Sequence, residues 1–408
     1  MKLLLIKAGK AVNTIKRDGL IRGGKRVGSA FFAMFGRVGS GDILFITGGV
    51  GDSALYRAHH QAEELSLHGF KCSITVQDNP LLVRYADKFK IFIFHRVLFT
   101  SSVQKLIERI KKQDKEIIFE TDDLVYDPKY LKYMDYHKQM NPLERKLYEN
   151  GVGGEILRDP YVKACTTTTS FLAEKLRAYG KKVFISANKL SNRDLMAVEK
   201  IKKASLRFPT QSISGHLPSN AGRKSNAVIG YFSGTISHNK DFAVAEDALI
   251  YILEKYPQTK LFLAGPLDIS SEFDKFQDRI ERVSYVPRDK HFENISMVDI
   301  SIVPLEVGNP FCESKSELKF FEAGILKVPT VASATRTFRE AVSDGVDGFT
   351  ATDISEWKEK LERLVSDDGL RKRMGEKAYE KSLKDYTNKN SRDSGYYEYL
   401  RSKLASNV

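Results

Sequence analysis

Short apolar runs alternate with longer amphipathic segments along most of the chain. From about residue 41 onward, runs of four to six residues rich in Ile, Leu, Val and Phe recur, and most precede a stretch with apolar residues at helical spacing. Runs that are apolar at nearly every position are typical of strands covered on both faces, as in a parallel sheet flanked by helices. The predicted strands are 43–47, 72–76, 90–95, 116–120, 163–168, 183–186, 228–232, 260–264, 282–286, 299–304 and 328–332. The predicted helices include 102–112, 170–179, 242–255, 315–323 and much of the chain from 354 onward.

This alternation predicts an α/β fold with two domains. Repeated strand–helix–strand units build a parallel sheet with helices on both faces. Residues 205–226 interrupt the alternation with prolines and glycines among polar residues, and we interpret them as a linker. We therefore expect two doubly wound, Rossmann-like sheets facing a cleft, the default place for a ligand. The expected parts are a basic arm at 1–40, a first domain at 41–204, the linker, a second domain at 227–385, and a helical tail at 386–408 that could pack back on the first domain.

Two lysines stand at the start of a helix predicted in the second domain. Ser314 and Glu317 have the spacing of a capping box, which predicts that this helix begins near Lys315. Lys315 and Lys319 then lie on one face, where their charges oppose the helix dipole. That arrangement is favourable when an anion such as a phosphate sits at the helix start. The alternative is an ordinary amphipathic helix with solvated lysines.

A glycine-containing turn points to the same place. The first strand of the second domain runs into a turn that contains Gly234 and Thr235. The stretch is Gly-Tyr-Phe-Ser-Gly-Thr-Ile-Ser-His-Asn-Lys, and its last residue is Lys240. A glycine there lets a ligand approach the backbone closely, and Lys240 could reach it. Glu322, about two turns into the next predicted helix, could accept hydrogen bonds from ribose hydroxyls. A tight turn with a surface lysine is the simpler alternative.

The first domain offers a second glycine-rich loop. Gly49-Val-Gly51-Asp-Ser-Ala follows the first predicted strand and matches G-x-G-x-x-A, so a nicotinamide-dependent oxidoreductase stays open. His95 and Arg96 stand at the end of one later strand and should both project from its carboxyl end, and Asp122 follows another strand. His95 could bond a sugar or acceptor, and Asp122 could contact the acceptor or cap the following turn.

The second domain resembles the nucleotide-sugar-binding half of GT-B glycosyltransferases, in particular the retaining family 4 (group 1). Phe-Glu-Ala-Gly-Ile-Leu-Lys-Val-Pro-Thr-Val-Ala-Ser at 321–333 is similar to the family's Glu-Ala-x-x-x-Gly-x-Pro-Val-Val-Ala-Ser. Lys240 and Glu322 keep the family's register. The first glutamate of its Glu-x7-Glu motif falls on Ser314, and its phosphate-binding arginine falls on Thr235. The first domain agrees in outline, including Tyr56-Arg57 in the helix after the glycine-rich loop.

The resemblance implies a glycosyltransferase that moves a sugar from a nucleoside-diphosphate sugar to a glycan or lipid-linked acceptor, with retention, in surface polysaccharide or glycan biosynthesis. It implies no metal and no other cofactor. A nicotinamide-dependent oxidoreductase, a GT-B nucleotide-sugar epimerase and a non-catalytic polyanion-binding protein remain alternatives. The expected donor residues are Gly234, Thr235, Lys240, Lys315, Ser316, Lys319 and Glu322. The acceptor-side residues are Gly49, Gly51, Tyr56 and Arg57, with His95 and Asp122 as catalytic candidates.

Positive charge is concentrated at the start of the chain. The 408 residues carry a net charge of +13, and nine basic residues against one acid give residues 1–40 a share of +8. Such an arm suits an anionic membrane surface, and a solvated tail or a packed first helix is the alternative. We expect no nucleic-acid partner, because no zinc-finger or RNP signature occurs. An opening apolar run of four residues is too short for export, so we expect a cytoplasmic protein, peripheral on the membrane if the arm binds it. The three cysteines fit no zinc spacing and no disulfide framework.

Overall fold

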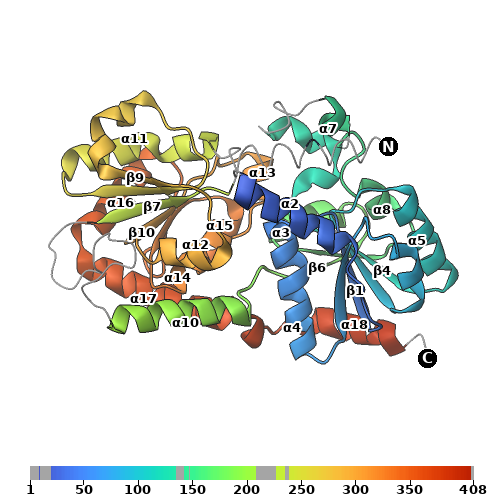
Figure 1. Cartoon of the computed structure of the whole chain (residues 1–408). Coiled ribbons are helices and arrows are strands. Elements are labelled where there is room, and N and C mark those ends of the chain that lie inside the picture. The colour runs from blue at the N-terminus through green and yellow to red at the C-terminus, as the bar shows by residue number, and fades with distance from the viewer. Residues whose placement is uncertain are drawn as a thin grey trace. The chain divides into compact units, whose positions relative to one another are not determined.

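The chain forms two compact units in the computed structural model (Figure 1). Unit 1 comprises the chain up to Asn188 and again from Arg392 onward, and unit 2 comprises Lys189–Ser391. The structure describes residue 9 and residues 20–134, 142–146, 148–207, 227–234 and 239–405.

Unit 1 is built on a six-stranded sheet in the order β2-β1-β3-β4-β5-β6. All neighbouring strands are parallel. The central strands β1 and β3 are buried at every position, which explains their unbroken apolar sequences. The strands are β1 (Ile43–Thr47), β2 (Cys72–Val76), β3 (Ile91–His95), β4 (Glu116–Thr121), β5 (Ala164–Thr167) and β6 (Lys182–Ile185).

The last helix of the chain completes unit 1. Tyr396, Tyr397 and Leu400 of α18 are buried in one core cluster with side chains of β1 and β3 (Figure 1). The hydroxyl of Tyr397 donates to Glu64. The helix after β1 consists of three consecutive segments, α3, η1 and α4, and η1 is a π-helix. The helices are α2 (Leu20–Met34), α3 (Asp52–Ala54), η1 (Leu55–His60), α4 (Gln61–Leu67), η2 (Leu82–Asp87), α5 (Ser101–Lys112), η3 (Leu124–Tyr126), η4 (Pro128–Tyr133), α7 (Pro142–Lys146), α8 (Gly154–Arg158), α9 (Ser170–Arg177) and α18 (Ser394–Ala405).

Unit 2 contains a second six-stranded parallel sheet, in the order β12-β11-β10-β7-β8-β9. Numbered within the unit, this is the 3-2-1-4-5-6 order of a Rossmann sheet. The first strand β7 therefore lies beside the fourth strand β10. The strands are β7 (Val228–Phe232), β8 (Lys260–Ala264), β9 (Ile280–Val283), β10 (Ile300–Val303), β11 (Thr330–Ser333) and β12 (Phe349–Ala351).

Close helix packing explains one glycine of unit 2. A Cβ on Gly324 would stand 2.4 Å from the hydroxyl oxygen of Ser382 and 2.9 Å from the carbonyl oxygen of Ala378, so only glycine lets α14 and α17 approach this closely. Trp357 of α16 is fully buried in the unit's core. The helices are α10 (Asn192–Arg207), α11 (Asn239–Lys255), η6 (Ser271–Arg279), α12 (Arg288–Ile295), α13 (Pro310–Glu313), α14 (Leu318–Gly324), α15 (Arg336–Ala341), α16 (Ile354–Ser366), α17 (Asp368–Asp385) and η7 (Asn388–Asn390).

The chain enters and leaves unit 2 through two segments that are joined to each other. Leu190 and Thr387 form a parallel bridge. The amide of Leu190 donates to the carbonyl of Tyr386 at 2.8 Å, and that of Asn388 donates to the carbonyl of Leu190 at 3.0 Å. The division between the units thus precedes the segment interpreted as a linker. Residues 205–207 of that segment belong to α10, and 208–226 lie outside the described residues.

The predicted fold class is confirmed, with corrections in detail. Both sheets are parallel and doubly wound, as the apolar runs indicated. Strand β9 begins two residues before the predicted range, and α10 and β12 were not predicted. Among the described residues, we find no helix long and apolar enough to cross a bilayer.

Candidate functional site

The strand order of unit 2 indicates where on its sheet a ligand would bind. From the central pair β7 and β10, the strand order continues with β8 toward one edge of the sheet and with β11 toward the other. The connections after β7 and β10 therefore diverge at the carboxyl edge, which is where open α/β sheets bind ligands. Gly234 and Lys240 follow β7, and Lys315, Ser316 and Lys319 follow β10. The topology thus brings five predicted donor residues to one switch point.

Lys319 on α14 is the half-buried cation of this edge. Its ammonium lies 4.9 Å from the centre of the Tyr231 ring. Burial, together with the smaller effect of nearby Lys315, lowers the pKa of Lys319 to about 8, although Asp241 and Glu322 act in the opposite direction. At neutral pH the group is still mainly charged, in surroundings that solvate it poorly. An arriving anion would relieve that cost.

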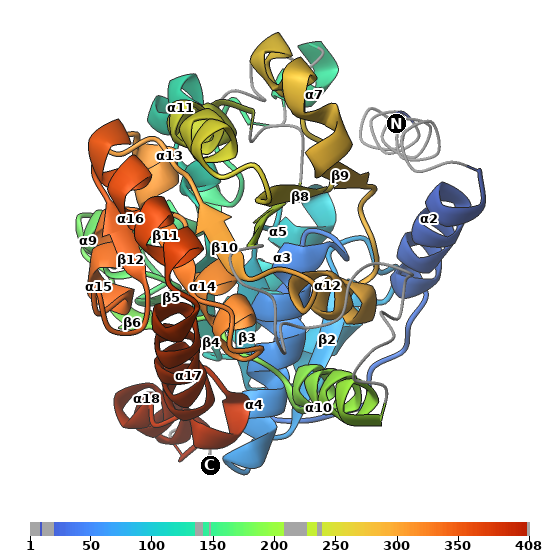
Figure 2. The ribbon, with the colours of Figure 1, turned by 90° about the vertical axis from the view of Figure 1, so that its left-hand side faces the viewer.

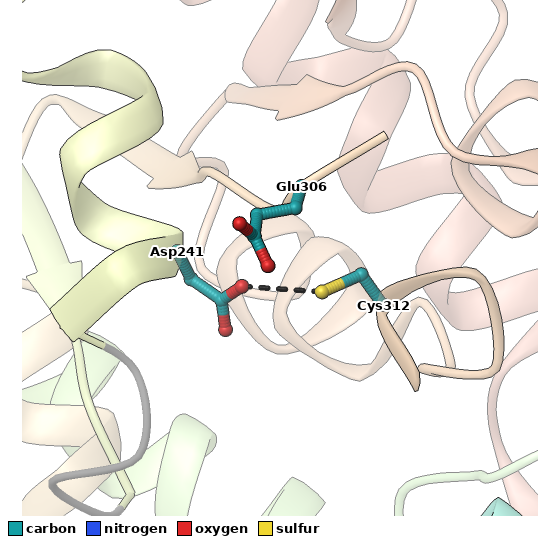
Figure 3. A group of neighbouring side chains, drawn as sticks. All are labelled: Asp241, Glu306 and Cys312. Carbon is teal, nitrogen blue, oxygen red and sulfur yellow. Dashed lines mark hydrogen bonds between the residues drawn. The ribbon is translucent and has the colours of Figure 1, made fainter. Parts of the chain in front are cut away.

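Three side chains of unit 2, among them Asp241 near Lys319, have the grouping of metal ligands (Figure 3). One ligand atom each from Asp241, Glu306 and Cys312 lies within 4.8 Å of the others. In the structure the Cys312 thiol donates to Asp241 Oδ1 at 3.2 Å. Burial raises the pKa of this thiol well above its ordinary value, so in this structure the sulfur is protonated and acts as a hydrogen-bond donor. We interpret the Asp241 carboxylate as the counter-charge of Lys319, with which it interacts electrostatically.

Glu322 is buried in an ion-pair cluster that the sequence did not predict. Its Oε1 accepts from Arg288 Nη1 at 2.6 Å, and its Oε2 lies 3.2 Å from His291 Nε2. Arg288 also binds both carboxylate oxygens of Asp194, at 2.7 and 3.2 Å. Helices α10, α12 and α14 each supply part of the cluster, so Glu322 is held in one orientation.

The helix predicted to begin near Lys315 begins later. Ser314 ends the short helix α13, where its hydroxyl donates to the Phe311 carbonyl at 2.7 Å. Glu317 is the N-cap of α14 but makes no side-chain cap bond. The capping-box prediction was therefore wrong, and Lys315 stands between two helices. Glu313 is occupied elsewhere, because it accepts the backbone amides of Gly308 and Arg336.

The other predicted donor residues differ in their surroundings. Lys240 is exposed in the first turn of α11. Gly234 is exposed just after β7, and no heavy atom of a described residue lies within 4 Å of where its Cβ would be, so a ligand could approach this backbone closely. Ser316 is half-buried between α13 and α14. Thr235 lies outside the described residues.

Unit 1 carries a pocket at its own switch point, between β1 and β3. The pocket has a volume of about 240 Å³. Gly49 and Gly51 line it on the side of β1, and His95 and Arg96 on the side of β3. Arg96 has a φ of 48°, a left-handed conformation that is uncommon outside glycine. Further lining is supplied by Gly48, Ser53, Ala54, Leu98, Val125, Tyr148 and Val152.

His95 is held by a buried network on the floor of this pocket. The Ser53 hydroxyl lies 2.7 Å from Asp122 Oδ2 and 2.9 Å from His95 Nε2. Burial would raise the pKa of Asp122, but Arg96 and His95 hold it far below its ordinary value. Asp122 is therefore ionised and takes the hydroxyl hydrogen, so the Nε2 atom of His95 must donate to Ser53. Its Nδ1 atom lies 3.7 Å from a carboxylate oxygen of Glu120. Both ring nitrogens thus face the protein's own groups.

Asp122 is likewise engaged. Its Oδ1 accepts from Arg96 Nε at 2.5 Å, and Arg96 Nη2 also binds Asp123 at 3.2 Å. The sequence placed Arg96 and Asp122 at strand ends but assigned no role to Ser53. Its only signal was its place in the glycine-rich stretch after β1.

Tyr56 and Arg57, predicted for the acceptor side, do not line the pocket. Both are buried, and Arg57 binds both oxygens of Glu120 at 2.9 and 3.2 Å. Arg57 also donates to Ser186 and Asn188 at 2.7 and 3.0 Å. Four contacts to the ends of two strands, β4 and β6, make it a structural ion pair of unit 1.

Comparison with known proteins agrees with this architecture. Residues 218–381 match the family model of group 1 glycosyl transferases. The structure is similar to that of HepE from Anabaena in complex with UDP (TM-score 0.55, 13% identity, 90% of this chain and 100% of that chain). It is also similar to sucrose-phosphate synthase from Thermosynechococcus elongatus (TM-score 0.58, 12% identity, 90% and 100%) and to a glycosyltransferase from Rickettsia africae (TM-score 0.54, 15% identity, 90% and 99%). No curated protein matches the sequence.

Two sheets of this order and these likenesses define the class. The chain has the GT-B fold of glycosyltransferases, as the sequence resemblance implied. Its residues 218–381, which match the group 1 glycosyl transferase model, include the lysines of the unit 2 switch point.

Proposed function

We propose that this chain transfers a sugar from a nucleoside-diphosphate sugar to an acceptor hydroxyl. The observation that carries the proposal is the group of lysines at the switch point of unit 2, with half-buried Lys319 at its centre. These lysines lie within the segment that matches the group 1 family model. Similar structures contain UDP and UDP-glucose, which supports a nucleotide sugar as the donor class.

The leaving group explains why cations are needed. In the proposed reaction the bond between the anomeric carbon and the diphosphate oxygen breaks, a bond to the acceptor oxygen forms, and the acceptor proton passes to the diphosphate or to solvent. Negative charge grows on the diphosphate as the bond breaks, and preorganised cations stabilise that charge most. Lys319 and Lys315 are proposed for this role, with Lys240, Ser316, Gly234 and Thr235 as further donor contacts. Because the lysines supply the charge, we propose that no metal is required.

Glu322 is proposed to bind the ribose of the donor. Arg288 and His291 fix its carboxylate, so a ribose hydroxyl would meet an acceptor that is already oriented. An oriented carboxylate loses little conformational freedom when the ligand binds.

The pocket of unit 1 is proposed to bind the acceptor. Gly49 and Gly51 leave its backbone side open, and a volume of about 240 Å³ would admit a sugar ring. His95 and Asp122 are proposed to orient the acceptor through Ser53, because neither ring nitrogen of His95 is directed into the pocket. We further propose retention in the manner of family 4, a glycan or lipid-linked acceptor of surface polysaccharide synthesis, and work on the cytoplasmic face of a membrane reached through residues 1–40.

A turnover assay tests the proposal. The full chain is incubated with a panel of UDP-, GDP-, dTDP- and ADP-sugars, with and without EDTA, and release of nucleoside diphosphate is followed together with the mass of the sugar product. We expect release from one donor, unaffected by EDTA, and its loss in Lys319→Met but not in Lys275→Met. Lys275 is an exposed lysine of the same unit, paired with Glu254. Epimerised donor without an acceptor product, or no release from any donor, would contradict the proposal.

A further inference from the structure

Helix α2 and Phe35, which directly follows it, expose large apolar side chains. Leu20 is 83% exposed, Phe31 57%, Phe32 75% and Phe35 57%. Phe31 contacts both other rings, with ring centres 6.2 Å from Phe32 and 5.1 Å from Phe35. The three rings thus form one aromatic surface rather than isolated exposed residues, and such a surface marks an interaction site.

The aromatic surface is held in place by another face of the helix. Gly23 is buried, and Val27, Ala30 and Met34 are half-buried, which is the spacing of one helix face. The carbonyl of Gly36, just after the helix, accepts from the Asn79 side chain at 2.7 Å. Helix α2 therefore uses its less bulky face to pack on unit 1. Figure 2 shows it as a separate helix outside the sheet and its covering helices.

The positive charge around the aromatic surface indicates which partner it would bind. No acidic residue occurs between positions 19 and 41, whereas this stretch has four basic ones, and residues 1–40 have a net charge of +8. Exposed aromatic residues on a basic, acid-free helix match the boundary between headgroups and acyl chains of an anionic bilayer. A partner protein would need complementary acidic and apolar patches together, which a bilayer provides at every point.

We infer that α2 is an interfacial anchor that inserts Phe31, Phe32 and Phe35 into an anionic bilayer. This inference specifies how the protein would bind the membrane. It rests on the proposed function only in the assumption that the acceptor is lipid-linked. Insertion of the rings adds a hydrophobic contribution to the attraction of the basic residues, so binding does not depend on charge alone.

The test measures vesicle binding of the full chain. Phosphatidylcholine vesicles with about 30 mol % phosphatidylglycerol are compared with pure phosphatidylcholine vesicles in a flotation assay, at low salt and at about 0.5 M NaCl, where surface charges are largely screened. We expect binding to anionic vesicles that persists in part at high salt. The double substitution Phe31→Ser, Phe32→Ser should weaken it at least about 20-fold. Leu67→Ser, which removes another exposed apolar residue of unit 1, should not.

A fluorescent variant reports insertion directly. The chain has one tryptophan, Trp357, which is fully buried, so Phe32→Trp adds a reporter against a constant background. Anionic vesicles should shift its emission to the blue, and brominated lipids should quench it. Unweakened binding of the double variant, complete loss of binding at high salt, or an unchanged Phe32→Trp spectrum would overturn the inference. So would a change from dimer to monomer in the double variant without a change in vesicle binding, because the surface would then join two copies. Nucleotide binding, measured on the same variants, separates a failure here from a failure of the proposed function.

Discussion

Replacing Lys319 by methionine should stabilise unit 2 while it removes donor binding. Burial lowers the pKa of Lys319 from its ordinary 10.5 to about 8. Each pH unit between the two values corresponds to about 1.4 kcal/mol, so keeping the lysine charged in the folded protein costs at most about 3 kcal/mol at pH 7. Methionine fills a similar volume without that cost. We therefore predict that Lys319→Met raises the free energy of unfolding at neutral pH by up to about 3 kcal/mol.

The gain should depend on pH in a definite direction. Below about pH 8 the folded and unfolded chains both carry a charged lysine, so the full cost is present. Between about pH 8 and 10.5 the folded lysine loses its proton while the unfolded one keeps it, and the cost falls toward zero. The difference between Lys319→Met and wild type should thus be largest at pH 7 and smallest near pH 10.

Urea unfolding followed by tryptophan fluorescence measures this difference. Trp357 lies fully buried in the core of unit 2, so its emission reports this unit. Lys275→Met serves as the matched surface substitution. A destabilised Lys319→Met variant, or a gain that is the same at about pH 7 and about pH 10, would refute the idea that Lys319 is strained by burial.

Three further predictions follow from other contacts. Arg288→Met leaves Asp194 and Glu322 without their shared cation, so it should lower the free energy of unfolding by about 3 kcal/mol in the same urea assay; an unchanged midpoint would show that the cluster is not stabilising. Ser53→Ala removes the link between His95 and Asp122 and should lower kcat at least about 10-fold while the nucleotide Kd changes less than about twofold; an equal loss in both would place Ser53 in donor binding. Burial of Cys165 and Cys312 and partial burial of Cys72 raise the pKa values of all three thiols. Native protein should therefore react slowly with a thiol reagent at about pH 8, and denatured protein should react at all three; fast native labelling would contradict the burial.

Local pattern was enough to predict the sheets. Strands such as β1 and β3 are covered on both faces, so nearly every residue in them must be apolar, and that composition is visible in the sequence. Strand β12 has only three residues and gives too short a signal. Helix α10 lies in a polar stretch, and its packing partners are distant in sequence.

The site was predicted less completely, because its contacts join distant segments. Arg288 lies 94 residues from Asp194 and 34 from Glu322, and nothing in the local sequence of any of them indicates the cluster. Arg57 suited the predicted cleft, but Glu120, 63 residues away, holds it in the core. The lysines of unit 2 were found because they lie close together in sequence after a strand. The capping-box prediction failed because Ser314 bonds backwards to a carbonyl rather than forwards to an amide.

The most direct test of the central claim is a calorimetric titration of the wild-type chain with UDP, GDP, dTDP, ADP and NAD(H), without added metal. We predict that one nucleoside diphosphate binds at one site per chain. In Lys319→Met its affinity should fall about 10- to 100-fold, the loss expected for a charge-assisted contact, and in Lys275→Met it should not change. Binding of NAD(H) alone, or equal affinity in wild type and Lys319→Met, would contradict a diphosphate site at the switch point of unit 2.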